Sequence, residues 1–219
     1  MKIHIKYAAM LGLFFILTTG CAVRKQAQDF FPLKPGNVWQ YDVDVQGENI
    51  QMMVEVGEPQ IVEGDHVFPF SYSYHELALP TQVEYYKVED NAVLFPRIDN
   101  IQGQFLKKPI QEFLQFPLSK GKKWGWSGKL VPVGINKESI SGDIVTVVKD
   151  IETVTTPAGT YKNAYRISIN SKFQTQGSSF SIKEDRWYVK GVGMVKEVLY
   201  DDRKGEVLTA VLKKFSIGR

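Results

Sequence analysis

The chain has few of the residues that usually carry chemistry. Its 219 residues include one cysteine, Cys21, and three histidines, so a disulfide within the chain and a cysteine-rich metal site are excluded. Only His66 and His75 lie beyond the N-terminal segment, and they do not have the spacing of a zinc motif. His66 follows an apparent turn at Glu63–Asp65, and His75 lies beside Glu76. We expect both side chains to be solvated rather than to act as ligands or bases.

A large excess of charge of one sign is also missing. The chain has 27 basic and 24 acidic residues, and two of the lysines, Lys2 and Lys6, lie in the N-terminal segment. The remainder is nearly neutral and lacks the concentrated basic face that nucleic acids require. Asp42 and Asp44 are spaced as at the start of a calcium loop, but Met53 stands where that loop needs a glutamate. We therefore expect no nucleic-acid partner and no bound metal.

Motifs for catalysis are absent as well. The sequence has no phosphate-binding glycine loop and no complete nucleophile elbow. Two acidic pairs, Glu184–Asp185 and Asp201–Asp202, are of the type used in glycoside hydrolysis. Acidic pairs near strand ends are more often solvated, and we expect that here. The sequence predicts a protein that is not an enzyme and needs no cofactor.

No hydrophobic run is long enough to cross a membrane. The apolar stretch Tyr7–Leu17 has about a dozen residues, fewer than the roughly 20 that a spanning helix needs. The two N-terminal lysines precede it, and the small residues Thr19 and Gly20 follow it, directly before Cys21. A basic head, a short apolar run and small residues are typical of a secretory signal peptide.

This segment resembles the lipobox signal of bacterial lipoproteins. That family usually has leucine three residues before the cysteine, where this chain has Thr18. The resemblance implies cleavage between Gly20 and Cys21 and lipidation of Cys21. Residues 1–20 would then be a signal peptide and residues 21–30 a tether. Plain secretion with a cut near Ala22 and an uncleaved anchor are the alternatives.

Lipidation would place the protein in the cell envelope, with the membrane as a partner of the N-terminal lipid anchor. Several acyl chains on Cys21 would hold it there stably, because two or more chains suffice for anchoring. In a host with two membranes the outer one is favoured. Ala22 follows the cysteine, in place of the aspartate that resembles an inner-membrane retention signal.

Alternation of apolar and polar residues dominates the rest of the chain. Trp39, Tyr41, Val43 and Val45 share one strand face and are separated by polar residues. Similar patterns predict further strands, among them residues 144–149, 163–173, 179–189, 194–200 and 206–216. One short helix is expected over 109–115, where Pro109 suits a first helical turn. Short turns and many strands indicate an antiparallel, all-β protein.

A sequence pattern occurs twice. Phe-Pro-Leu-x-x-Gly-x-x-Trp-x-aromatic spans Phe31–Tyr41 and returns 85 residues later at Phe116–Trp126. The repeat predicts two duplicated β modules, residues 31–115, which include a connector, and residues 116–219. Neither module is large enough to be clearly self-sufficient, so we expect them to share one core. The expected architecture is a curved sheet, as a half-barrel, or a sandwich.

Three segments together resemble uncharacterised β-rich domains of exported bacterial proteins and lipoproteins. They are Pro32–Tyr41, Thr156–Tyr161 and Trp187–Val195. The resemblance implies a fold of strands and turns and brings no known activity with it. By fold analogy alone, some exported lipoproteins of this size are half-barrels that carry lipid acyl chains.

Two groups of residues are candidates for binding. One is an aromatic stripe that is expected either to pack in the core or to line an apolar groove: Phe68, Phe70, Tyr72 and Tyr74. The other lies at the start of a predicted strand and would be either simply solvated or in contact with anionic headgroups or an acidic polymer: Lys120, Lys122, Lys123 and Trp124.

These observations predict a non-catalytic lipoprotein of the cell envelope. Its all-β domain would bind an apolar or amphipathic ligand, with a lipid as one candidate. The alternative is a structural or assembly partner in an envelope protein complex, docked through an edge strand or an apolar patch.

Overall fold

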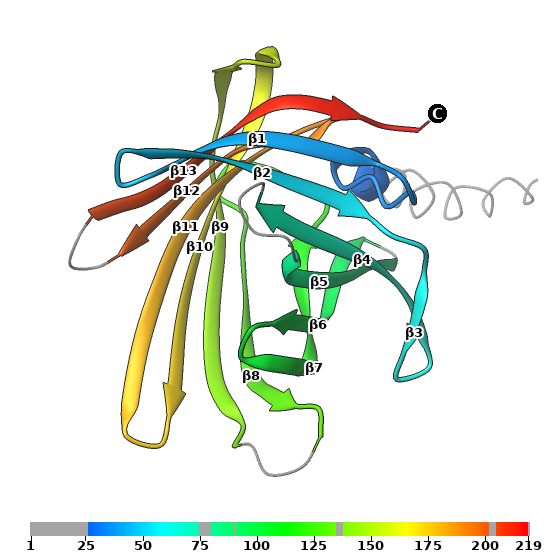
Figure 1. The fold of residues 1–219 in the computed structure, drawn as a ribbon, viewed down its shortest axis with the longest axis vertical. Coiled ribbons are helices and arrows are strands. Elements are labelled where there is room, and N and C mark those ends of the chain that lie inside the picture. The colour runs from blue at the N-terminus through cyan, green and yellow to red at the C-terminus, as the bar shows by residue number, and fades with distance from the viewer. Residues whose placement is uncertain (1–25, 75–79, 90, 135–137, 202–204, 219) are drawn as a thin grey trace, which may run out of the picture.

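Thirteen strands and one short helix make up the described part of the chain (Figure 1). The computed structural model describes residues 26–74, 80–89, 91–134, 138–201 and 205–218, so Cys21, the signal segment and His75 lie outside it. Residues 26–30 form the helix. The strands are β1 (Val38–Val45), β2 (Glu48–Val56), β3 (Gln60–Val62), β4 (Asp65–Tyr74), β5 (Pro80–Glu89), β6 (Ala92–Asn100), β7 (Gly103–Gln115), β8 (Lys123–Pro132), β9 (Ile140–Thr156), β10 (Gly159–Thr175), β11 (Ser178–Val189), β12 (Gly193–Asp201) and β13 (Gly205–Ser216).

The sheet closes on itself into a twelve-stranded barrel. Each strand from β4 to β13 pairs antiparallel with the next in sequence, and β13 continues to β1 and β2. The ring closes where β2 pairs with β4, from Met52 opposite Tyr74 to Val56 opposite Phe70. The short strand β3 pairs with β4 outside this ring. The all-β, antiparallel prediction is confirmed, but the expected open half-barrel or sandwich is wrong, because the β2–β4 pairing removes the free edges.

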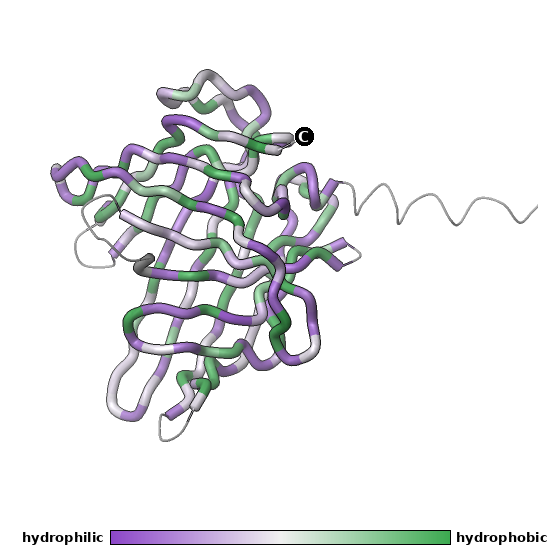
Figure 2. The backbone as a smooth tube through the Cα atoms, turned by 45° about the vertical axis from the view of Figure 1, so that its right-hand side comes forward, coloured by the Kyte–Doolittle hydropathy of each residue, from purple (hydrophilic) through white to green (hydrophobic). Residues whose placement is uncertain are grey.

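Alternation along the strands sorts side chains between the inside and the outside of the barrel. In β1, Trp39, Tyr41 and Val43 are buried, and the residues between them are exposed or half-buried. The same alternation of hydrophilic and hydrophobic residues runs along the long strands in Figure 2. Among the described residues, no helix is long and apolar enough to span a membrane.

The expected helix over 109–115 is wrong, because these residues belong to β7. Phe105, Lys107, Gln111 and Phe113 are buried at alternating positions on either side of a bulge. The ladder with β8 ends at Lys108, and pairing with β6 resumes at Gln111. Pro109 therefore sits where no ladder needs its missing N–H group, as is usual for proline within a sheet.

Two tryptophans join β7 and β8 beyond the end of their ladder. The indole of Trp124 donates to the carbonyl oxygen of Glu112 at 3.1 Å. The indole of Trp126 donates to the carbonyl oxygen of Pro109 at 2.7 Å. Along this stretch, which we call the indole seam, side-chain donors replace the usual backbone pairs.

The repeated sequence pattern forms the same turn in both places. Gly36 and Gly121 have φ angles of 82° and 84°, values that glycine adopts easily. Their N–H groups both donate at 2.8 Å, to the carbonyl oxygens of Val56 and Val148. Each turn leads into a strand with an inward tryptophan. The division into two duplicated modules stays a prediction.

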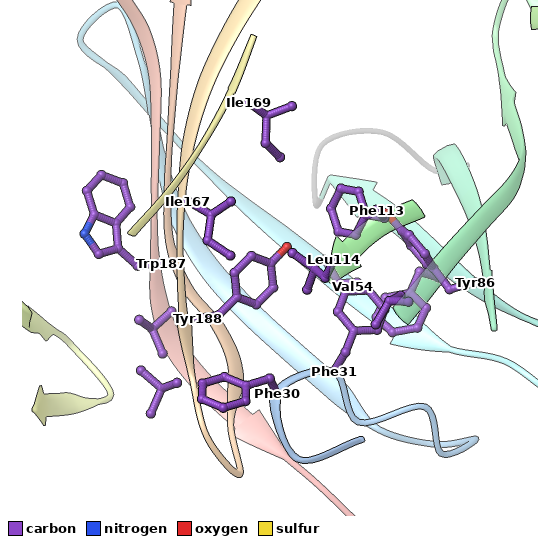
Figure 3. Close-up of a cluster of buried hydrophobic side chains, with 14 of the residues drawn as sticks. Phe30, Phe31, Val54, Tyr86, Phe113, Leu114, Ile167, Ile169, Trp187 and Tyr188 are labelled. Carbon is purple, nitrogen blue, oxygen red and sulfur yellow. The ribbon is translucent and has the colours of Figure 1, made fainter. Parts of the chain in front are cut away.

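The N-terminal segment closes one end of the barrel. Residues 26–30 and Phe31, which we call the plug, bury Ala27, Phe30 and Phe31 against the inner wall. In Figure 3, Phe31 lies between Tyr188 on one wall and Tyr86 and Phe113 on the other. The last five residues of the expected tether are thus part of the folded domain.

Candidate ligand-binding site

The barrel encloses a cavity with two adjoining lobes. One lobe of about 500 Å³ lies at mid-barrel, and the other, of about 570 Å³, lies toward the end opposite the plug. They share four lining residues, Gln82, Ile98, Phe173 and Ile182. Volumes of this size are typical of small-molecule sites, which are concave and mostly preformed.

Strand direction gives the order of the lobes along the barrel. In β11, inward side chains run from Phe180 and Ile182 through Glu184 and Arg186 to Tyr188, which contacts the plug. The first two line the lobe at the open end, and the next two line the mid-barrel lobe. The mid-barrel lobe therefore separates the open-end lobe from the plug.

A carboxylate with three neutral donors lies in the wall of the mid-barrel lobe. The hydroxyls of Tyr72 and Tyr86 donate to Oε2 of Glu84 at 2.8 and 2.6 Å, and the amide of Gln82 donates to Oε1 at 2.7 Å. Glu84 is 4 % exposed. These three bonds compensate for the lost hydration of the carboxylate and fix its position.

Across the lobe, one guanidinium lies between two further carboxylates. Arg186 contacts Oε2 of Glu184 through Nη2 at 3.1 Å and Oε1 of Glu197 through Nε at 2.8 Å. Its guanidinium also lies 5.4 Å from the ring centre of Phe113. Burial, together with the neighbouring Glu197 and Glu84, raises the pKa of the Glu184 carboxyl to about 7 despite Arg186.

The second interior cation, Lys107, lies beside the mid-barrel lobe. Its ammonium donates to Oε1 of Gln111 and lies 3.7 Å from the ring centre of Phe95. Gln111 and Phe95 line the cavity, whereas Lys107 lies behind them. Burial lowers the pKa of Lys107 to about 7.

The lobe at the open end is mainly apolar. Besides the shared residues, its walls include Phe105, Leu130, Ile140 and Phe180. At the rim, Ile101 is 92 % exposed in the β6–β7 turn and Phe180 is 47 % exposed beside the β10–β11 turn. Exposed apolar side chains thus stand at the mouth of an apolar lobe.

The structure places most of the aromatic stripe inside the barrel. Tyr72 and Tyr74 line the mid-barrel lobe, and Phe70 lines a small pocket of about 30 Å³ next to the plug. Phe68 packs against the core. The stripe thus contributes both to the core and to the wall of an internal cavity. That these residues line an apolar groove and bind a ligand there stays a prediction.

The expected surface group is only partly on the surface. Lys123 is exposed, and Lys120 is exposed and paired with Asp150 at 2.9 Å. Lys122 donates to the carbonyl oxygens of Gln115 and Pro117. Trp124 is 7 % exposed, so its inclusion as a surface contact is wrong; its indole is used in the indole seam.

Most of the charged residues of the cavity were missed by sequence analysis. His66 is exposed as expected. Among the described residues, no three or more His, Cys, Asp or Glu side chains are placed so that they could hold a metal ion. The acidic pair Glu184–Asp185 was expected in water, but Glu184 lines the cavity. Asp185 is 1 % exposed on the outer side and pairs with Arg166 at 2.6 Å. The missed signal is the period of two, which places Glu84, Glu184 and Arg186 on the same faces as buried aromatic residues.

Fold and cavity together define a closed antiparallel barrel with an internal site of ligand size. The C-terminal part of the chain, residues 130–212, matches the family described as DUF3108-like. No curated protein matches the chain.

Two solved structures share this fold. A candidate exported protein with a YmcC-like fold from Bacteroides fragilis is 14 % identical, with a TM-score of 0.59, and the match covers 85 % of this chain and 98 % of that one. A candidate lipoprotein from Parabacteroides distasonis is 17 % identical, with a TM-score of 0.56 and the same coverage of both chains. At these identities the likeness establishes the fold, and the predicted resemblance to β-rich domains of exported proteins holds at that level.

Proposed function

We propose that this protein is a non-catalytic binding protein of the cell envelope that holds an amphipathic ligand inside its barrel. The observation that carries the proposal is the two-lobed cavity, in which one lobe holds buried charged groups and the other is mainly apolar. A packed barrel of purely structural use would fill such space with side chains, because protein interiors are close-packed. Buried charged groups are also costly to keep in a wall that serves packing alone.

The envelope location rests on the signal segment and on the fold relatives. A lipobox-like sequence ends at Cys21, and one similar structure is described as a candidate lipoprotein and another as a candidate exported protein. Lipid attached to Cys21 would hold the barrel at a membrane, by its plugged end, since only four residues separate Cys21 from the helix at 26–30. In a host with two membranes, Ala22 favours the outer one.

The assembly role is the second candidate, and the exposed rim favours it. Ile101, Phe180 and Val133 are 92 %, 47 % and 46 % exposed, and all three lie at or next to turns at the open end. Exposed apolar groups that cluster in this way often mark a protein contact. The closed ring leaves only the short strand β3 as a described edge, so docking by strand addition is the weaker form of this role.

Native mass spectrometry tests the binding role. The chain from Ala22 onward contains every described residue and would be exported, then purified without detergent. We expect an additional mass of several hundred daltons, roughly what a cavity of this size accommodates, that is released on denaturation.

A matched pair of variants locates the ligand. Ser171 lines the mid-barrel lobe, and Ser181 is exposed one strand away on β11. Ser171→Phe places a ring in the lobe and should reduce the fraction of protein that carries the additional mass. Ser181→Phe should leave that fraction unchanged. A clean apo mass for the unaltered chain, combined with no uptake of added alkyl compounds, would refute the binding role and favour the assembly role.

A further inference from the structure

The charged residues of the cavity lie toward the plug, and its apolar residues lie toward the open end. This order is the reverse of that in a site that takes up the apolar tail of its ligand first. From the open end toward the plug, β11 presents Phe180, Ile182, Glu184 and Arg186 in that order. On β5, Gln82 is shared by both lobes and Glu84 lies on the mid-barrel lobe. The charged groups therefore lie deep, and the apolar walls lie next to the mouth.

We propose that the ligand enters with its polar end first, that this end is a positively charged donor group such as an ammonium, and that its hydrocarbon part fills the apolar lobe at the mouth. The proposal rests on the proposed function and names the chemistry of that same site. The ammonium would lie between Glu84 on one wall and Glu184 and Glu197 on the other.

Charge balance favours a cation over an anion. The described residues that surround the mid-barrel lobe include three carboxylates, Glu84, Glu184 and Glu197, and one guanidinium, Arg186. Lys107 adds a second positive charge from behind Phe95 and Gln111. Glu184 and Lys107 both have a pKa of about 7, so their charges largely offset each other. Glu84 and Glu197 then exceed Arg186 by one negative charge. A ligand with a single positive charge would balance the interior, whereas an anion would double the excess.

The hydrogen bonds point the same way. Glu184 and Glu197 each contact Arg186 through one carboxylate oxygen, so the second oxygen of each can accept a bond from a ligand. Glu84 is held by neutral donors, and no lysine or arginine of the described residues lies within ion-pair distance of it. Burial near Glu197 and Glu84 also raises the pKa of Glu184, because a further negative charge is unfavourable there. A bound cation would stabilise that charge.

Three probes with ten carbon atoms each test the charge of the polar end. Decylammonium, decanoate and decanol would be titrated calorimetrically into the chain from Ala22 onward. We expect decylammonium to bind at least about tenfold more tightly than decanoate. Equal or tighter binding of decanoate would overturn the proposal while leaving the binding function intact. If none of the three binds, the proposed function fails, and this inference fails with it.

Variants test the site and the orientation separately. Glu197→Gln should reduce the preference for decylammonium, while Glu55→Gln, the same change on the exposed outer face of β2, should leave it unchanged. If Glu197→Gln fails to fold by circular dichroism, Glu184→Gln serves in its place. Phe180→Ser removes a ring at the mouth and should weaken decylammonium more than the shorter hexylammonium. Equal losses for the two chain lengths would overturn the head-first orientation.

Discussion

Removing the Phe31 side chain is the most direct test of how much the plug stabilises the barrel. Phe31 is 6 % exposed, and its ring lies 5.0 Å from that of Phe70 and 4.7 Å from that of Tyr86. It also lies 6.0 Å from Phe113 and 6.3 Å from Tyr188. Deleting a buried phenylalanine side chain costs about 3–5 kcal/mol, since both burial and packing are lost. Four ring contacts put Phe31→Ala toward the upper part of that range, about 4 kcal/mol.

Urea unfolding followed by tryptophan fluorescence measures this loss. The midpoint should fall with little change in the slope, because the surface exposed on unfolding hardly changes. Phe215→Ala is the control, since Phe215 is 36 % exposed on β13 and should cost about 1 kcal/mol or less. A loss below about 1.5 kcal/mol for Phe31→Ala would mean that the plug is not part of the cooperative core.

Two further predictions concern the wall and its charges. Because burial raises the pKa of Glu184 from its ordinary 4.5 to about 7, its contribution to stability is complete below pH 4.5 and is lost as the pH rises to 7. Glu184→Gln should flatten a plot of urea midpoint against pH between pH 4.5 and 7. An unchanged slope would contradict the raised pKa of Glu184. At Gly128 an added Cβ would lie 2.4 Å from the carbonyl oxygen of Lys108 and 2.7 Å from the Trp126 ring. Gly128→Ala should therefore cost about 1–3 kcal/mol in the same assay, and a wild-type midpoint would show that the neighbouring strand yields freely.

Much of the local structure follows from the sequence. Alternation at Trp39–Val45 and the predicted strand at 179–189 both fall within observed strands, because a period of two admits no other regular structure. The helix expected over 109–115 failed for a related reason. Proline suits both a first helical turn and an unpaired strand position, and only the partner strands decide between them.

Closure and the interior charges could not be predicted in the same way. The pairing of β2 with β4 joins strands that are not consecutive in sequence, so no local turn signals it. Glu84, Glu184 and Arg186 lie on inward faces, but a charged residue in an alternating strand is ordinarily assigned to the solvent side. Their position becomes intelligible only once the sheet is closed around space that a ligand can fill.

The indole seam has a mechanical consequence for the wall. Elsewhere in the ring, moving two strands apart breaks a series of backbone bonds in register. Between Pro109–Glu112 on β7 and Trp124–Trp126 on β8, two side chains span the strands instead. Both tryptophans are buried, and substituting either one removes its hydrogen bond across the wall, which no backbone pair replaces there. Along this line the closure of the wall thus depends on the identity of two side chains, whereas a backbone ladder forms with almost any residue.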